Sequence, residues 1–183
     1  KDTKEFTWLF FKNIATKITA TGVDPVEYKT IDGYIWASDI LDRDYYGTNY
    51  EGCDADKFIK ILGGEQTPSL RKIIGYLISR YKDPLNPKAV VLMEDIDAES
   101  EGESQGGSGK GLCVQFVKKF RKTTDFDGKN FRFSDPFLFQ NVSPDTSIIF
   151  IDDIERSFKF NSMFSILTGP LLINRKNKEQ VII

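Results

Sequence analysis

The chain has 183 residues, of which 40% are hydrophobic and 28% are charged, values typical of a globular protein. Its net charge of −2 gives no general case for nucleic-acid binding, so any such case depends on local charge. The sequence has no histidine and only two cysteines, Cys53 and Cys113, which excludes Ser-His-Asp triads, Cys-His dyads and common zinc sites and argues against a disulfide framework. Its chemistry must therefore use carboxylates, lysine, backbone amides or a hard metal.

Hydrophobic runs and chain ends bear on where the protein works. No apolar run is long enough to cross a bilayer, and no basic and apolar leader precedes a cleavage site. The low cysteine count fits a reducing compartment, so we expect a cytoplasmic protein without a membrane partner. The chain opens at Lys1 and stops at Ile183 within an apparent strand, and we therefore expect a fragment of a larger protein.

Helical patterns dominate the first part of the chain. Near the amino terminus, five apolar residues follow a helical spacing: Phe6, Leu9, Phe10, Ile14 and Ile18. Residues 54–63 indicate a short helix that follows an aspartate cap. Residues 67–82 indicate a longer helix, with Thr67 as N-cap and Pro68 at its first position. Residues 22–49 follow no regular pattern.

The middle of the chain alternates apolar and polar segments. Residues 88–93 (KAVVLM) predict a buried strand, and the six carboxylates of residues 94–103 predict a solvated loop. Residues 111–122 predict an amphipathic helix, residues 130–133 a strand, and residues 135–142 a short helical piece. The inward side of the amphipathic helix is predicted to hold Leu112, Val114, Phe116, Val117 and Phe120. Its basic residues are expected to form a solvated face: Lys118, Lys119, Arg121 and Lys122.

The last part of the chain contains a second apolar run. Residues 147–151 (SIIFI) predict a buried strand that ends at Asp152 and Asp153. Residues 162–169 indicate a short helix that ends at its glycine. Residues 170–183 have two apolar arms around a basic tip, which predicts a β-hairpin.

A glycine-rich segment lies between the strand and the helix predicted for residues 88–122. Gly106, Gly107 and Gly109 would let successive backbone amides converge on phosphate oxygens without interference from side chains. Lys110 would meet the outer phosphates, and the helix that starts there would add its positive end. A strand before and a helix after the loop are the context that a phosphate-binding loop requires.

The match to the common phosphate-loop pattern is incomplete. Ser104 stands where the first glycine belongs, and Gly111 replaces the hydroxyl residue that normally helps to hold magnesium. A flexible glycine-serine linker is the alternative interpretation of this segment.

The paired acids after the second strand complete the pattern of a nucleotide site. Asp152 would hold Mg²⁺, mostly through water, and Asp153 would orient or polarise the attacking water. The alternative is a buried strand that ends in two exposed aspartates. Because the glycine loop and the paired acids occur together and in order, we predict a site for ATP and Mg²⁺.

From about residue 73 to its end, the chain resembles superfamily-three helicases. It is most similar to the poxvirus-primase-helicase-like AAA+ proteins of phages and mobile elements, of the Bacteroides-type subgroup. The segments that carry the resemblance are GGSGKGL, GKNFRFSDPFLFQNVSPDTSIIFIDD and ILTGPLLINRKNK, and the last is also similar to papillomavirus-type helicases. The resemblance implies an ATPase in a bacterial host that forms a homo-hexameric ring and tracks single-stranded DNA with a hairpin.

Roles for single residues follow from the resemblance by position. It implies that nucleotide is bound by Gly106, Gly107, Ser108, Gly109, Lys110 and Gly111. Lys110 would contact the outer phosphates, while Asp152 and Asp153 would serve magnesium and water as above. Lys176, with Asn177 beside it, stands where the hairpin of the family touches DNA, although some relatives have histidine in place of Asn177.

Local charge gives a separate argument for the hairpin tip. Arg175, Lys176 and Lys178, less Glu179, give a charge of +2 within five residues, and such a turn can neutralise phosphates. An ordinary charged hairpin turn is an equally good interpretation.

We therefore expect an α/β P-loop NTPase with a central, mostly parallel sheet flanked by helices, a small N-terminal helical segment and a C-terminal β-hairpin. An accessory segment is predicted over residues 1–66 and an ATPase core over residues 67–183. The resemblance places a sensor asparagine and a trans-acting arginine beyond Ile183, so this chain should bind nucleotide better than it hydrolyses it. The predicted function is an ATP-dependent DNA helicase in replication of a phage, plasmid or mobile element. The alternatives are a nucleotide-switched initiator or loader, and a degenerate interaction domain.

Overall fold

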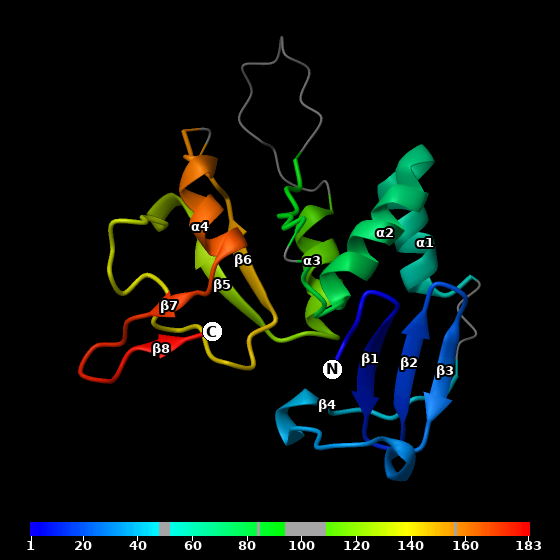
Figure 1. Ribbon diagram of the computed structural model, residues 1–183. Helices are drawn as coiled ribbons and strands as arrows, with labels where there is room; N and C mark the ends of the chain where they lie inside the picture. The colour runs from blue at the N-terminus through cyan, green and yellow to red at the C-terminus, as the bar shows by residue number, and fades with distance from the viewer. Residues whose placement is uncertain (48–51, 84, 94–108, 156) are drawn as a thin grey trace. The chain divides into compact units, whose positions relative to one another are not determined.

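The computed structural model describes residues 1–47, 52–83, 85–93, 109–155 and 157–183. The chain is mixed α/β and forms two compact units (Figure 1). The first unit comprises residues 1–81 and 90–120, and the second comprises residues 82–89 and 121–183. The boundary predicted after residue 66 falls inside the first unit, between two of its helices, and stays a prediction.

A four-stranded sheet opens the first unit. Its strands are β1 (Phe6–Phe11), β2 (Ala15–Thr19), β3 (Val23–Val26) and β4 (Ile40–Leu41), in the order β3-β2-β1-β4. β1 to β3 pair antiparallel, and β4 joins β1 in parallel. One face of β1 is buried, and the other carries half-exposed aromatic rings whose centroids lie 6.0 Å apart in sequence order: Phe6, Trp8 and Phe10.

The helix predicted over Phe6 to Ile18 is wrong, because this segment forms β1 and β2. Most side chains on both faces of β1 are apolar, so the sequence lacks the alternation of apolar and polar residues that marks a half-buried strand. The spacing of the apolar residues then resembles that of a helix. Aromatic and β-branched residues favour a strand here, and Lys12 and Asn13 lie between the two strands. The small N-terminal helical segment is therefore a sheet followed by one helix.

The helices of the first unit are α1 (Asp54–Gly63), α2 (Thr67–Ile78) and α3 (Lys110–Lys118), with 3-10 turns η1 (Tyr28–Thr30), η2 (Ala37–Asp39) and η3 (Gly64–Gln66). The helices predicted from residue 54 and residue 67 are confirmed. Their caps differ from the prediction: Cys53 Sγ, and not an aspartate, accepts from the Asp56 amide. Thr67 continues the helical backbone of η3, and its hydroxyl donates to the Gly64 carbonyl at 2.6 Å.

The second unit is built around two parallel strands, β5 (Thr123–Asp127) and β6 (Ile148–Asp152). The other elements are η4 (Gly128–Asn130), η5 (Phe160–Met163), α4 (Phe164–Thr168), β7 (Leu172–Ile173) and β8 (Val181–Ile182). The strand over residues 148–151 is confirmed, although its side chains are half-buried and not buried as predicted. The short helix that ends at Gly169 and the C-terminal hairpin are confirmed as well. A central, mostly parallel sheet is not present among the described residues, where β5 and β6 form a parallel sheet of two strands.

Three other predicted elements are absent from the described part of the chain. Residues 88–93 form no strand, because no described strand pairs with them, and Val91 and Met93 are exposed. Residues 130–133 and 135–142 form loops and turns, while β5, which alternates threonine, aspartate and phenylalanine, was missed. On α3, Val114 and Val117 face inward as predicted, but Leu112 is 62% exposed and Cys113 is buried in its place.

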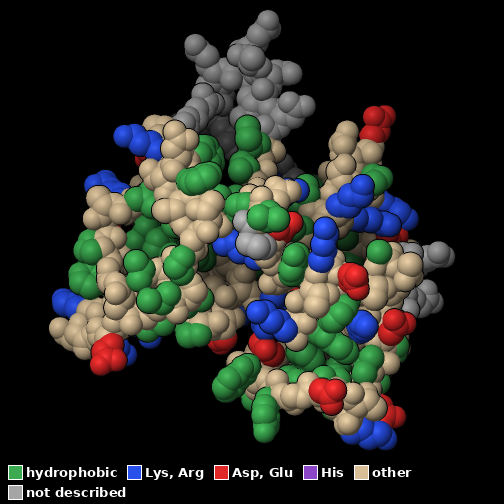
Figure 2. Space-filling model, in the orientation of Figure 1, with side chains coloured by type: hydrophobic (Ala, Val, Ile, Leu, Met, Phe, Trp, Pro, Cys, Tyr) green, Lys and Arg blue, Asp and Glu red, His purple; other side chains and the backbone are tan. Residues whose placement is uncertain are grey.

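Aromatic rings fill the core of the second unit. Phe126 on β5 contacts Phe131 and Phe139, with ring centroids 5.4 and 5.7 Å apart. Val142 and Ile173 are buried. Large hydrophobic side chains also reach the surface of both units, as the space-filling view shows (Figure 2). Within the described ranges, none of the helices has the length and apolar character that crossing a membrane requires.

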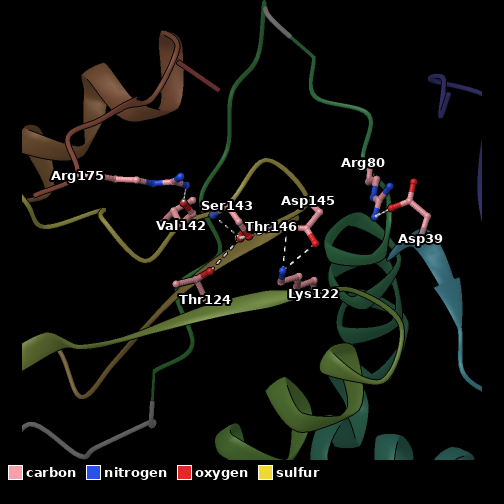
Figure 3. Close-up of polar contacts among 9 residues, drawn as sticks. All are labelled: Asp39, Arg80, Lys122, Thr124, Val142, Ser143, Asp145, Thr146 and Arg175. Carbon is pink, nitrogen blue, oxygen red and sulfur yellow. Dashed lines mark hydrogen bonds and ion pairs between the residues drawn. The ribbon is translucent and has the colours of Figure 1, made fainter. Parts of the chain in front are cut away.

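Asp56, whose side chain is nearly buried, joins α1 to α2. Its Oδ2 lies 2.7 Å from Lys60 Nζ, and its Oδ1 accepts from Arg71 on α2. The hydrogen bond from Lys60 holds the pKa of Asp56 below its ordinary value, and burial opposes this shift. A carboxylate with a lowered folded pKa stabilises the fold above its unfolded pKa, and that contribution is lost as pH falls through the folded pKa. A second ion pair, Asp39 with Arg80 at 2.6 Å, ties the segment before β4 to the residues after α2 (Figure 3).

We expect Asp56→Ala to lower the melting temperature of the first unit by several degrees at neutral pH, because two cations lose their shared carboxylate. The matched control is Asp54→Ala, which removes an exposed carboxylate 3.6 Å from Lys57 on the same helix and should have little effect. The difference between wild type and Asp56→Ala should shrink below pH of about 4, as the unpaired and then the paired carboxyl become protonated. Thermal unfolding followed by circular dichroism checks this, and equal effects of the two substitutions would contradict it.

Candidate functional site

The N-terminus of α3 is fixed by Gly109. Gly109 has a φ of 83°, in the left-handed region, and precedes the first residue of the helix. A Cβ at this position would lie 3.0 Å from Leu62 Cδ1 of α1. The positive φ is what favours glycine here, and a methyl group would in addition push on the Leu62 side chain. Gly106, Gly107 and Ser108 lie outside the described residues, so their predicted role in holding phosphate stays a prediction.

Lys110 is the first residue of α3 and is half-buried. The Cys113 amide donates to the Gly109 carbonyl at 3.0 Å, and the first turn contains no acidic side chain. The positive end of the helix is thus not neutralised by a carboxylate of its own first turn. Gly111 has no atom within 4 Å of the position of a Cβ, so close packing does not require glycine there. Burial raises the pKa of the Cys113 thiol, which makes it a poor nucleophile.

The second half of the predicted site lies at the carboxyl edge of β5 and β6. The strands are parallel, and Asp127 at the end of β5 stands opposite Asp152 at the end of β6. The next residue, Gly128, is buried against the other strand, since a Cβ there would lie 2.4 Å from the Asp152 carbonyl oxygen. The backbone of the turn after β5 therefore touches the backbone that carries the predicted acids.

The paired acids have different surroundings. Asp152 Oδ1 accepts from the Asp153 amide at 3.0 Å. Asp153 has a φ of 53°, which aspartate tolerates better than most residues, and its carboxylate lies 2.7 Å from Lys129 Nζ. This contact with Asp153 raises the pKa of Lys129. The Asp127 carboxylate instead caps its own turn by accepting from the amide of Lys129 and the side chain of Asn130.

Reasoning from the sequence missed Asp127, Gly128 and Lys129 as neighbours of the paired acids. The signal that was present is the Asp-Gly pair, a turn marker that indicates where a strand ends. The strand predicted at residues 130–133 lies downstream of this turn, whereas β5 lies before it.

The amino edge of the same two strands is held by a polar network (Figure 3). Lys122 Nζ lies 2.8 Å from Asp145 Oδ2, and the Thr124 and Thr146 hydroxyls are 3.0 Å apart. Lys122, followed by Ser143, lowers the pKa of Asp145 through hydrogen bonds. In the basic cluster predicted as a solvated face, Arg121 is buried, while Lys122 is exposed and pairs with Asp145.

The four residues predicted to bind DNA have different surroundings at the hairpin tip. Arg175 Nη2 donates to the Val142 carbonyl at 3.0 Å, so this guanidinium anchors the hairpin (Figure 3). The Lys178 amide donates to the Arg175 carbonyl, and Asn177 occupies the left-handed region with a φ of 57°. Lys176 and Lys178 are exposed on this turn. The predicted basic tip therefore consists of two available lysines.

Asp152 is the residue predicted to hold Mg²⁺, and that role stays a prediction. Within the described ranges, no group of three or more acidic, cysteine or histidine side chains forms a metal cage. Magnesium accompanying a nucleotide usually takes one or two carboxylates, with water and phosphate oxygens as its other ligands.

Lys110 belongs to the first unit, whereas Asp152 and Asp153 belong to the second. Their joint action on one nucleotide stays a prediction. Comparisons with family models, curated proteins and solved structures find no match to this chain.

We expect Gly128→Ala to reduce the stability of the second unit by about 1–3 kcal/mol, because the added methyl overlaps the backbone after β6. Gly22→Ala is the control, since that position has open space and no positive φ, and its effect should stay within about 0.5 kcal/mol. Urea unfolding measures both. A Gly128→Ala protein as stable as wild type would show that the turn does not press on β6.

Proposed function

We propose that the protein is an ATP-dependent DNA helicase or translocase acting in the replication of a phage, plasmid or mobile element in the bacterial cytoplasm. The observation that carries the proposal is the strand β6, which ends at Asp152, is followed directly by Asp153 and lies beside a parallel strand. The proposed fold is that of an AAA+-like P-loop NTPase. Homo-hexamers and single-stranded DNA are the proposed partners.

The geometry of each half supports an assigned role. A helix that starts at Lys110 behind a left-handed glycine has the positive end and the ammonium that polyphosphate binding needs. We propose that Gly109, Lys110 and Gly111, with Gly106, Gly107 and Ser108, bind ATP. Asp152 would hold Mg²⁺, and Asp153 would orient the attacking water.

Phosphoryl transfer of this type depends on positioning and on neutralising negative charge. The bound Mg²⁺ would supply charge neutralisation between the phosphates. The two adjacent aspartates would then have separate roles, Asp152 toward Mg²⁺ and Asp153 toward water. Their carboxylates have different partners, since Asp152 accepts from the Asp153 amide and Asp153 pairs with Lys129.

We expect Lys110→Ala to abolish the stabilisation that MgATP gives the protein. Nucleotide at a hundredfold over its dissociation constant should add about 2.7 kcal/mol to wild type, and this gain should vanish in the variant. Lys119→Ala, which removes an exposed lysine just after α3, is the control and should retain the gain. Thermal shift with and without MgATP measures it. No shift in wild type would favour a degenerate interaction domain with a glycine linker.

Gly111 favours the second candidate, a nucleotide-switched initiator or loader with little turnover, because it supplies no hydroxyl for magnesium. Strand displacement from a forked duplex by the full-length protein separates the two. Displacement that Lys110→Ala abolishes supports the helicase. ATP-dependent DNA binding without displacement supports the loader.

The hairpin gives a separable prediction about DNA. We expect Lys176→Ala and Lys178→Ala each to weaken binding of single-stranded DNA and to lower the slope of log K against log salt by about 0.7, the value for one phosphate contact. Arg175→Ala should instead destabilise the hairpin, because its guanidinium holds the Val142 carbonyl. Fluorescence anisotropy over a salt series, with thermal unfolding of each variant, checks this. An unchanged slope in both lysine variants would contradict DNA contact at the tip.

A further inference from the structure

Lys129 lies at the carboxyl edge of β5 and β6, beside the paired acids. It follows β5 by two residues, and its Nζ lies 2.7 Å from Asp153 Oδ2. Gly128 sets its position, because the backbone there lies against Asp152 and Ile154 with no room for a side chain. The lysine therefore starts from a fixed backbone point beside the end of β6.

Asp153 is the carboxylate that lies within ion-pair distance of Lys129, while Asp127 and Glu155 act on it from farther away. Asp127 is engaged by the Lys129 amide and by Asn130, and Asp152 accepts from the Asp153 amide. The Lys129 ammonium is left to Asp153, whose side chain is 69% exposed. An exposed aspartate without such a partner would sample several rotamers.

Stability does not account for this pair. The side chains of Lys129 and Asp153 are both mostly exposed, and ion pairs of that kind contribute little to folding. The pair instead places the Asp153 carboxylate beside one defined partner, the Lys129 ammonium, at 2.7 Å. Direction matters most for a group that must align a water molecule with a phosphorus atom.

We propose that Lys129 is a positioning residue that orients the Asp153 carboxylate for its work on the attacking water. The inference rests on the proposed function, in which Asp153 orients the water that attacks ATP. The ammonium acts through Asp153, so its loss slows turnover without weakening the binding of nucleotide.

The test compares Lys129→Met with Lys122→Met in the full-length protein. Lys122 makes the equivalent pair with Asp145 at the opposite edge of the same two strands, so both variants lose one lysine from an ion pair. We expect Lys129→Met to lower kcat by about tenfold, with KM for ATP within about twofold of wild type. Lys129→Arg should restore most of kcat, and Lys122→Met should leave it unchanged.

A second measurement does not depend on turnover. In nucleotide-free protein labelled with ¹³C-aspartate, Lys129→Met should move the side-chain carboxyl resonance of Asp153, which Asp153→Asn identifies by its loss. Lys122→Met should move the Asp145 resonance and leave that of Asp153 in place. The melting temperatures of Lys129→Met and wild type should agree within about 1 °C.

The outcomes distinguish this inference from the proposed function. Wild-type protein that neither binds nor hydrolyses ATP would overturn the proposed function, and the inference with it. Wild-type turnover with an equally fast Lys129→Met would overturn the inference alone. So would an Asp153 resonance that does not move, or a loss of kcat as large in Lys122→Met as in Lys129→Met.

Discussion

The parallel pairing of β5 with β6 is the constraint on which the candidate site depends. Parallel strands bring their carboxyl ends to the same edge, and the observed register sets Asp127 opposite Asp152. A slip of one residue would turn each side chain of β6 to the other face. The register is fixed at the carboxyl edge by Gly128 against the Asp152 carbonyl, and at the amino edge the Thr124 and Thr146 hydroxyls meet at 3.0 Å. The positions of the acids are thus a product of contacts outside the acidic pair.

Two short strands cannot hold such a register by backbone hydrogen bonds alone. The second unit adds a cluster of phenylalanine rings on one side, where Phe131 is buried among Phe126, Phe139 and Phe158. The C-terminal hairpin contributes Ile173, which is fully buried, and Arg175, which binds the Val142 carbonyl. The hairpin and the segment before β6 are therefore parts of one packed structure, so that displacement of one must strain the other.

Local pattern was sufficient where one signal dominated. A β-branched apolar run predicts β6, and caps with regular spacing predict α1 and α2. Local pattern failed where pairing with another strand decides the outcome. Residues 88–93 have the apolar composition of a buried strand but pair with no described strand. Residues 123–127 lack such an apolar run, yet they form β5 because they pair with β6. The predicted position of Asp152 and Asp153 at a strand end is confirmed. Lys129 was out of reach, because its closeness to Asp153 follows from the strand pairing and not from any spacing in the sequence.

The charge of the hairpin illustrates the same dependence on packing. The tip carries three cations and one anion, but the Arg175 guanidinium donates to the Val142 carbonyl, which leaves Lys176 and Lys178 as the exposed cations of the turn. One such tip would bind a phosphate chain weakly at physiological salt. Several tips arranged around one strand would bind it far more tightly, because each further contact is then intramolecular. Under the proposed function, affinity for DNA is therefore a property of the assembled ring, and the single hairpin needs only to present two lysines on a rigid turn.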